Sequence, residues 1–326
     1  MIRKIDDLKG ECVTVSPIEF KPLTIEDKPI YDVYYNKSGT RISDVHMASR
    51  MAWGKGFNYV WTEIRDTLLV LSPKSVFSTI HFSMPLGLTS KEQMEGIVDD
   101  LWDEYAPRFA EQTGSEPHLR FLYLEKSDLQ YFNFLDKYES EILMKPAFSD
   151  YVYAAENLQT LRGKFYNGKR NHVNKFMRAY PFYEFRPLQK EDEEVCLNLV
   201  SDWGEEKTEN LEDLRKSDYV PTQTLFRYFD ELEMSGGTLW VGKDLVAFSM
   251  VSPGAKDTCI VHIEKADVSY RGSYAVINKL TAETICEDTL WINREEDMGI
   301  EGLHKAKQSY GPSYMVDKYE VRLTKK

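Results

Sequence analysis

NLQTLRGKFYNGKRNHVNKFMRAYPFY, residues 157–183, is the stretch around which the rest of this 326-residue chain is organised. It holds six basic side chains and no acidic one, although the formal net charge of the chain is -12. Such a local island of positive charge attracts an anion that the acidic remainder repels. We expect this basic stretch to join two similar halves and to supply charge to a site between them. A solvated helix that only exposes basic side chains is the alternative.

Length and composition indicate a globular protein of one large or two medium domains, because 326 residues is about twice the usual domain length and 42% are hydrophobic. The acidic sequence pI of about 5.1 argues against broad, nonspecific DNA binding and leaves only local contacts with a polyanion. We find no run of about 18 apolar residues and no apolar signal region in MIRKIDDLKGE, so the sequence predicts a cytoplasmic protein without a transmembrane segment.

The four cysteines lie far apart and form no C-x-x-C pair, so no zinc site and no disulfide is expected, and reduced, mostly buried thiols are the prediction. No metal site is predicted anywhere in the chain. The oligomeric state is left open.

Before the basic stretch, the pattern predicts an α/β unit. Residues 1–30 are expected to form an entry segment, and Ser90 is expected to cap a helix whose stripe from Met94 to Tyr105 is apolar. The predicted elements are a helix from Ser43 that ends at Gly54 and Gly56, strands 57–64, 67–72 and 77–84, the helix after Ser90, strand 119–125, helix 128–139 and strand 150–156.

After the basic stretch, a similar order of elements begins again. The predictions are strand 182–189, helix 191–203, a polar loop or lid 204–218, helix 224–234, strands 238–242, 245–253 and 259–267, helix 275–286, strand 289–295, helix 301–310 and strand 314–323. We therefore predict an α/β fold with mixed sheets in two domains, 31–160 and 182–326, joined by a basic connecting helix 161–181. The two domains are expected to bury the apolar stripe of residues 94–105 together.

Several motifs resemble those of a known family. The strand and helix YEFRPLQKEDEEVCLNLVSDW (183–203), followed by a hairpin and the helix after Gly272, resemble the GCN5-related N-acetyltransferase (GNAT) fold. LRGKFYNGKRNHVNKF (161–176), HIEKAD (262–267) and INREEDMGIEGLHKAKQSYGP (292–312) are similar to bacterial proteins related to the C-terminal domain of phosphatidylglycerol lysyltransferase. This resemblance implies two tandem acyl-CoA N-acyltransferase-like domains. It also implies aminoacyl-tRNA as a donor, because the lysyltransferases use it in place of acetyl-CoA.

The donor site is expected at two places. CoA-binding members of the GNAT family carry a glycine-rich loop before a helix, whereas YRGSYA (270–275) offers only Arg271 and Gly272, which weakens the expectation of acyl-CoA. A simple turn glycine is the alternative for Gly272. The basic stretch supplies the second place, where we predict that phosphate of the donor meets four residues, Lys169, Arg170, Asn171 and Lys175.

Catalytic and substrate-binding residues are predicted on two strand ends of the second half. His262 and Glu264 alternate with Ile263 on one strand, so they face the same side and are candidates for an acid/base pair. A structural histidine is the alternative for His262. The next strand end and helix offer carboxylates and an amide for a substrate ammonium, and lysines for a phosphate or oxyanion: Asn293, Arg294, Glu295, Asp297, Lys305 and Lys307. A solvated loop with surface ion pairs is the other interpretation.

Two classes of function follow from these candidates. The first is an acyl- or aminoacyl-transferase that moves an activated group, from aminoacyl-tRNA or acyl-CoA, to an amine or hydroxyl acceptor such as a small molecule or lipid headgroup. The second is a non-catalytic module that binds a charged small molecule or an RNA end. Convergence of Glu264, Glu295 and Lys305 around one pocket would favour the enzyme.

Overall fold

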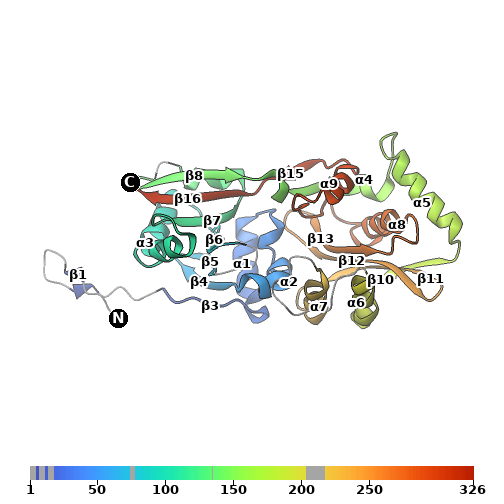
Figure 1. Cartoon of the computed structure of the whole chain (residues 1–326), viewed down its shortest axis with the longest axis horizontal. Coiled ribbons are helices and arrows are strands. Elements are labelled where there is room, and N and C mark those ends of the chain that lie inside the picture. Colours follow the sequence, from blue (N-terminus) through green and yellow to red (C-terminus); the bar gives the residue numbers. More distant parts are fainter. Residues whose placement is uncertain (1–4, 7–11, 14–17, 74–77, 134, 203–216) are drawn as a thin grey trace.

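The computed structural model describes residues 5–6, 12–13, 18–73, 78–133, 135–202 and 217–326. Two seven-stranded mixed sheets lie side by side along the long axis of the molecule, with helices against them (Figure 1). A separate two-residue pair joins β1 (Ile5–Asp6) to β2 (Cys12–Val13). The predicted α/β class, with mixed sheets in two units, is confirmed. The predicted loop or lid 204–218 falls almost wholly outside the described residues.

The first sheet contains one parallel pair, β6 with β7, and all its other neighbours are antiparallel. Parallel neighbours need a crossover, and the long helix α3 supplies it. In spatial order the strands are β3 (Lys21–Pro22), β4 (Val60–Ile64), β5 (Thr67–Ser72), β6 (His81–Ser83), β7 (Leu119–Leu124), β16 (Tyr319–Lys325) and β8 (Tyr138–Met144).

Helix α3 (Lys91–Thr113) begins where the sequence predicts, because the Ser90 hydroxyl accepts a hydrogen bond from the Gln93 amide at 3.1 Å. It ends at Gly114, whose φ of 67° suits the left-handed cap. Its predicted apolar stripe is buried, but only against one face of the first sheet. The expectation that both domains bury this stripe together is therefore wrong.

The second sheet repeats this plan, with one parallel pair, β13 with β14, bracketing helix α8. Its remaining neighbours are antiparallel. In spatial order the strands are β10 (Tyr183–Pro187), β11 (Ser235–Val241), β12 (Asp244–Pro253), β13 (Thr258–Ala266), β14 (Trp291–Asn293), β9 (Asp150–Ala154) and β15 (Tyr314–Val316).

The halves of the chain exchange a strand. β9 precedes the basic stretch yet pairs in the second sheet, and β16 closes the chain yet pairs in the first. The single strand predicted over 314–323 is two strands in different sheets, with Asp317 and Lys318 between them. The domain boundaries 31–160, 161–181 and 182–326 stay a prediction. The two sheets do not coincide with them, because β9 and β16 each pair in the sheet of the other half.

A shared core fills the space between the sheets. The inner faces of both sheets contribute to it, through Trp61 and Val70 of the first and Phe248 and Ile263 of the second. The helices around this core are α1 (Lys28–Ser38), α2 (Met47–Phe57), α6 (Glu193–Asp202) and α7 (Tyr219–Arg227). Because α2 packs on α7, the two units meet through apolar contacts and not only through the basic stretch.

The basic stretch forms two helices that cover the outer face of the second sheet. They are α4 (Ala155–Thr160) and α5 (Asn167–Ala179), and α5 buries Val173 and Phe176 against α8. Helix α8 (Ser273–Leu280) continues as a π-helical turn, Thr281–Ile285, and α9 is Glu301–Gln308. Five short 3-10 turns complete the described elements: Ile25–Asp27, Ser43–Val45, Lys126–Tyr131, Pro146–Phe148 and Lys190–Asp192.

Several local predictions are wrong. The helix predicted over 128–139 is the 3-10 turn followed by β8, and the helix predicted over 224–234 ends at Arg227. Helix α1 went unpredicted. Cys259 and Cys286 form a disulfide between β13 and the end of the π-helical turn, with their Cα atoms 6.1 Å apart, which corrects the expectation of reduced thiols throughout.

Candidate functional site

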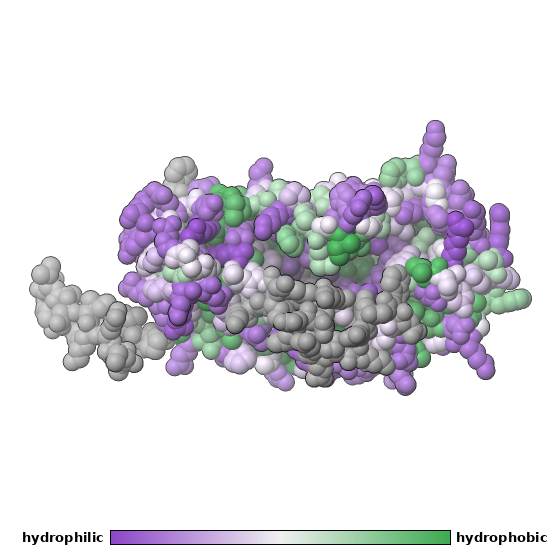
Figure 2. Space-filling view, viewed as in Figure 1, coloured by the Kyte–Doolittle hydropathy of each residue, from purple (hydrophilic) through white to green (hydrophobic). Residues whose placement is uncertain are grey.

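A cleft of about 1230 Å³ lies where β13 and β14 part after three paired residues. Both units line it, the first through residues such as Tyr59, Arg120 and Tyr123, and the second through the ends of β13 and β14. The face drawn in Figure 2 is hollowed near its middle, between the parts that Figure 1 assigns to the two sheets. Ligands of α/β proteins commonly bind at such a divergence of parallel strands.

His262 and Glu295 form a hydrogen-bonded pair in the cleft. His262 Nδ1 lies 3.0 Å from Glu295 Oε1, and Nε2 lies 2.7 Å from the Ser252 hydroxyl. Burial lowers the pKa of His262 to about 3, so the ring is neutral and one nitrogen donates while the other accepts. We assign the proton to Nδ1, which then donates to Glu295, while Ser252 donates to Nε2.

Glu295 has two unusual properties for a carboxylate. Burial, together with the nearby charges of Glu296 and Asp150, raises the pKa of its carboxyl well above the usual range. Its backbone φ is 56°, in the left-handed region that a non-glycine residue rarely occupies. Strained backbone and a shifted pKa in a cleft together mark a functional candidate.

The predicted pair of His262 with Glu264 has a different geometry. Glu264 lines the same cleft, but its Oε1 accepts from Arg294 Nη2 at 2.8 Å and its Oε2 accepts from Asn278 Nδ2 at 3.1 Å. The carboxylate of Glu264 is therefore already occupied by a cation and an amide. The partner of His262 is Glu295.

Lys169 and Arg294 form a cationic wall beside this pair. Both lie over the ring of Tyr310, with Lys169 Nζ 3.7 Å and Arg294 Cζ 5.0 Å from its centroid. Burial and the neighbouring Arg294 lower the pKa of Lys169 to about 8. Arg294 Nη1 is buried and makes no hydrogen bond with the described residues. Among the described residues, Glu264 is the carboxylate that offsets these two cations, so the wall retains positive charge for an anion.

Gly272 and Arg271 lie where the cleft meets helix α8. Gly272 has a φ of 104°, and a Cβ there would lie 2.8 Å from the carbonyl oxygen of His172. A glycine is thus required both by its backbone conformation and by the close approach of α5. Arg271 is exposed on the cleft wall.

The other residues predicted on the strand end and α9 support the loop that carries Glu295. Asn293 is buried, and its Oδ1 accepts from the Glu295 amide at 2.7 Å. Lys307 Nζ donates to the carbonyl oxygens of Arg294 at 2.6 Å and Glu295 at 3.2 Å. Asp297 is buried and accepts from Tyr151 and His304. These contacts hold the loop, and Asn293 and Asp297 do not line the cleft.

Four further predicted residues lie outside the cleft lining. Lys305 is paired with Glu301 on the exposed face of α9. Arg170 donates to the carbonyl oxygens of Leu161 and Gly163, so it holds the turn before α5. The last two, Asn171 and Lys175, are exposed on α5. Of the three residues proposed to converge on one pocket, Glu264 and Glu295 do so and Lys305 does not.

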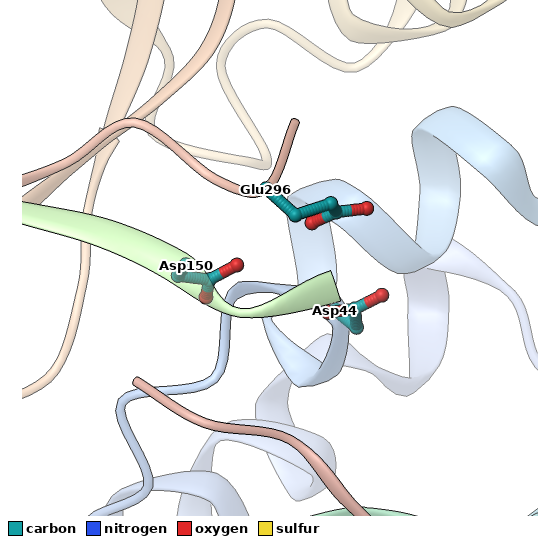
Figure 3. A group of neighbouring side chains, drawn as sticks. All are labelled: Asp44, Asp150 and Glu296. Carbon is teal, nitrogen blue, oxygen red and sulfur yellow. The ribbon is translucent and has the colours of Figure 1, made fainter. Parts of the chain in front are cut away.

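Three carboxylates gather beside the cleft around one buried lysine. Asp44, Asp150 and Glu296 come from three different segments, and their oxygens lie within 4.8 Å of one another (Figure 3). Lys318 Nζ contacts all three, at 2.6 Å from Asp150 and 2.8 Å from Glu296, and in a shorter contact with Asp44. Because an ammonium already occupies the place that a cation would take, this cluster does not fit a metal ion.

The rim of the cleft carries exposed apolar side chains. They come from the end of β8, the following turn and the loop before α9, and they are Leu143, Met144, Phe148, Met298 and Ile300. Exposed apolar side chains around a charged interior suit a molecule with a polar end and an apolar body.

The sequence did not predict the cleft residues that come from the first half of the chain and from the connection between β15 and β16. Asp44, Ser49, Tyr123 and Lys318 belong to this set. Lys318 lies in no motif, and only the exchange of strands between the sheets brings it to the carboxylates. No local pattern signals it.

Comparison with known proteins identifies relatives along almost the whole chain. The family model described as "Phosphatidylglycerol lysyltransferase, C-terminal" matches residues 40–322. A conserved protein of unknown function from Bacteroides thetaiotaomicron has a TM-score of 0.80 and 29% identity, over 94% of this chain and 100% of that chain. The structure of L-PGS from Bacillus licheniformis has a TM-score of 0.58 and 14% identity, over 90% and 91%, and shows the same fold.

An uncharacterised protein of Mycoplasmoides gallisepticum is 28% identical over 191 residues, which is 57% of this chain and 60% of that protein. The match thus spans less than two thirds of the curated relative. Among the described residues, no helix combines the length and the apolar character needed to cross a membrane.

Proposed function

The chain belongs to the phosphatidylglycerol lysyltransferase C-terminal family, and we propose that it transfers an activated aminoacyl group from aminoacyl-tRNA to an amine or hydroxyl acceptor. The observation that carries this proposal is Glu295, whose backbone is strained and whose carboxyl has a raised pKa, paired with neutral His262 in the cleft between the two units. A general base works best when its pKa is close to the working pH, and burial moves Glu295 toward that range.

Glu295 acts as the base in this proposal. The acceptor nitrogen or oxygen attacks the ester carbonyl of the donor and passes its proton to the Glu295 carboxylate. A new acceptor–carbon bond forms, the ester bond to the tRNA hydroxyl breaks, and the leaving oxygen receives the proton. His262 Nδ1–H orients the carboxylate, and Asn293 fixes the Glu295 backbone through the amide.

Lys169 and Arg294 bind phosphate of the donor in this arrangement. Two cations on one tyrosine ring, with Glu264 as the carboxylate that offsets them among the described residues, favour an anion at the cleft wall. Arg271 extends the positive wall toward α8. Arg170 and Lys175, which were predicted to share this role, are not part of it.

The apolar rim supports an acceptor with a polar headgroup and an apolar body. Leu143, Phe148 and Ile300 expose large side chains at the cleft mouth, and the reacting groups lie inside. A lipid whose headgroup carries the attacking hydroxyl or amine fits this division.

A transfer assay tests the proposal. The chain is mixed with tRNAs charged with labelled amino acids and with vesicles that contain phosphatidylglycerol, and label entering the lipid phase is counted under single-turnover conditions. Acetyl-CoA replaces the tRNA in a parallel reaction, because Gly272 and Arg271 also border the cleft. We expect transfer from aminoacyl-tRNA that Glu295→Gln abolishes. Tight binding of charged tRNA without transfer to any acceptor would favour the non-catalytic alternative.

A further inference from the structure

A second cavity of about 280 Å³ lies on the junction of the two units, between α2 of the first and α7 of the second, and we call it the α2–α7 pocket. The turn at Thr24 closes one side. It shares only Tyr59 with the lining of the cleft, so it is a separate site.

The described lining of the α2–α7 pocket is basic. Arg50 and Lys55 of α2 and Arg227 of α7 border it, and no aspartate or glutamate among the described residues does so. The whole chain has a formal net charge of -12, so three cations without a lining carboxylate are unusual here. Asp27 lies near by, but its oxygens are held by Lys21 and Thr24.

The environment of Arg50 is a second, independent observation that points to a bound anion. Its side chain is 0% exposed, yet Nε and Nη1 make no hydrogen bond with the described residues. Nη2 donates to the Ser83 hydroxyl at 2.7 Å, and the guanidinium lies 4.4 Å from the ring centroid of Tyr59 and next to the side chain of Tyr31. A buried cation without a carboxylate partner is costly, and a bound anion would remove that cost.

We propose that the α2–α7 pocket binds the phosphate group of a small molecule. One guanidinium and two further cations suit the charge of a phosphate, and Tyr228 also lines the pocket. Typical pockets for larger ligands start at roughly 300 Å³, so this one suits inorganic phosphate or a short phosphate ester and not a nucleotide.

The position of the pocket gives the ligand a structural effect. The first unit supplies Arg50 and Lys55, and the second supplies Arg227, so a bound phosphate links the two units across their apolar interface. Helix α2 also carries Ser49, whose hydroxyl lies 3.4 Å from His262 Nδ1. Phosphate binding therefore stabilises the helix that touches the catalytic pair.

Isothermal titration calorimetry at constant ionic strength tests the proposal with inorganic phosphate and with glycerol 3-phosphate. Wild type should show saturable binding of at least one of them at millimolar concentration, and tighter binding of the ester would identify a short phosphate ester as the ligand. The double variant Lys55→Ala/Arg227→Ala should weaken binding about tenfold or more, because each exposed cation is expected to donate a charge-assisted contact. Lys243→Ala, an exposed lysine in the β11–β12 turn, is the matched control and should bind as wild type does.

Lys169→Ala separates this site from the cleft. Unchanged phosphate binding by Lys169→Ala together with weakened binding by the double variant supports the α2–α7 pocket, whatever the transfer assay shows. Loss of binding in Lys169→Ala with normal binding in the double variant would move the phosphate to the cleft and overturn the proposal. Absence of saturable binding in wild type would overturn it as well.

Discussion

The two sheets each contain one parallel strand pair, and the two pairs differ in what they hold. In the first unit β6 and β7 part beside aromatic rings, and Arg50 lies between Tyr59 and Tyr123 with no carboxylate partner among the described residues. In the second unit β13 and β14 part beside His262 and Glu295. We call these places the first and the second opening.

Both openings border the same cleft, so the difference between them is one of chemistry and not of access. The second opening places a carboxyl with a raised pKa beside a neutral imidazole, which allows proton transfer. The first opening offers aromatic surface and hydroxyls, which allow packing and hydrogen bonding. A repeated topology therefore does not imply a repeated reaction, because function depends on the residues placed on the fold.

The largest expected effect is the loss of kcat caused by a substitution in the second opening. Glu295→Gln keeps the shape and the contact with His262 but cannot accept a proton, so we expect kcat to fall by about 10²–10⁴-fold. Tyr123→Phe, which removes a hydroxyl from the first opening, should change kcat by less than about threefold. Single-turnover transfer measures both variants, and thermal melting checks that both are folded.

Equal losses of kcat in Glu295→Gln and Tyr123→Phe would contradict this comparison, since both openings would then take part in the reaction. A normal kcat in Glu295→Gln would remove Glu295 from the mechanism and leave His262 as the candidate base.

The next effect concerns Lys318 and Arg50, two of the buried cations among the described residues. Lys318→Met leaves Asp44, Asp150 and Glu296 without their cation, and we expect the free energy of unfolding to fall by about 3–5 kcal/mol near neutral pH. Arg50→Met strands no carboxylate and loses the contact with Ser83, so about 1–2 kcal/mol is expected. Urea denaturation of both variants measures the difference.

The control for Lys318→Met is the pH dependence of the loss in unfolding free energy. Burial and the neighbouring carboxylates raise the pKa of Asp44 to about 7 even with Lys318 present. A carboxyl with a raised folded pKa contributes stability that is present below its unfolded pKa near 4 and is lost as pH rises toward 7. Without Lys318 this loss should grow, so wild type and variant should differ most above pH 7 and least near pH 4. A difference that is constant with pH would mean that packing, and not charge, is lost.

A smaller effect is expected where each crossover helix begins. α3 begins with a side-chain cap from Ser90, whereas α8 begins at Gly272 with a φ of 104° and the His172 carbonyl close by. Gly272→Ala should therefore cost about 1–3 kcal/mol of unfolding free energy and displace α5. Ser90→Ala should cost about 1 kcal/mol and leave the cleft unchanged. Urea denaturation and donor affinity, measured together, separate the two, and an unchanged donor affinity in Gly272→Ala would contradict the role of this junction in the cleft.

Much of the fold was predictable because its signals are local. The run TLLVLS is β5 over the predicted residues 67–72, and Ser90 caps its helix as expected. Helix α1 was missed, although Pro29 stands in its first turn, where a proline suits a helix. The strand exchange of β9 and β16 rests on long-range pairing, which no local pattern contains.

The site was predictable in position but not in its pairings. Lys169, His262, Glu264, Arg294 and Glu295 all line the cleft. Strand alternation suggested Glu264 as the partner of His262, whereas the partner is 33 residues away on the loop after β14. Arg170 was expected to bind phosphate because of its charge, but a charge pattern cannot show that backbone carbonyls already occupy the guanidinium.

The smallest predicted effect tests whether the cationic wall belongs to the second opening alone. Burial and Arg294 lower the pKa of Lys169 to about 8, so in the folded protein this lysine loses its charge as pH rises through 8. Donor affinity should be constant from pH 6 to 7.5 and should then fall by up to about tenfold per pH unit. Lys169→Arg should remove the decline, because a guanidinium stays charged over this range.

The control is Lys145→Ala, which changes an exposed lysine where the first unit borders the cleft. It should lower donor affinity slightly and leave the inflection near pH 8 in place. Filter binding of charged tRNA across this pH range measures all three proteins. If the inflection disappears in Lys145→Ala and persists in Lys169→Arg, the donor phosphate lies on the wall of the first unit, and the assignment of the donor to the second opening is wrong.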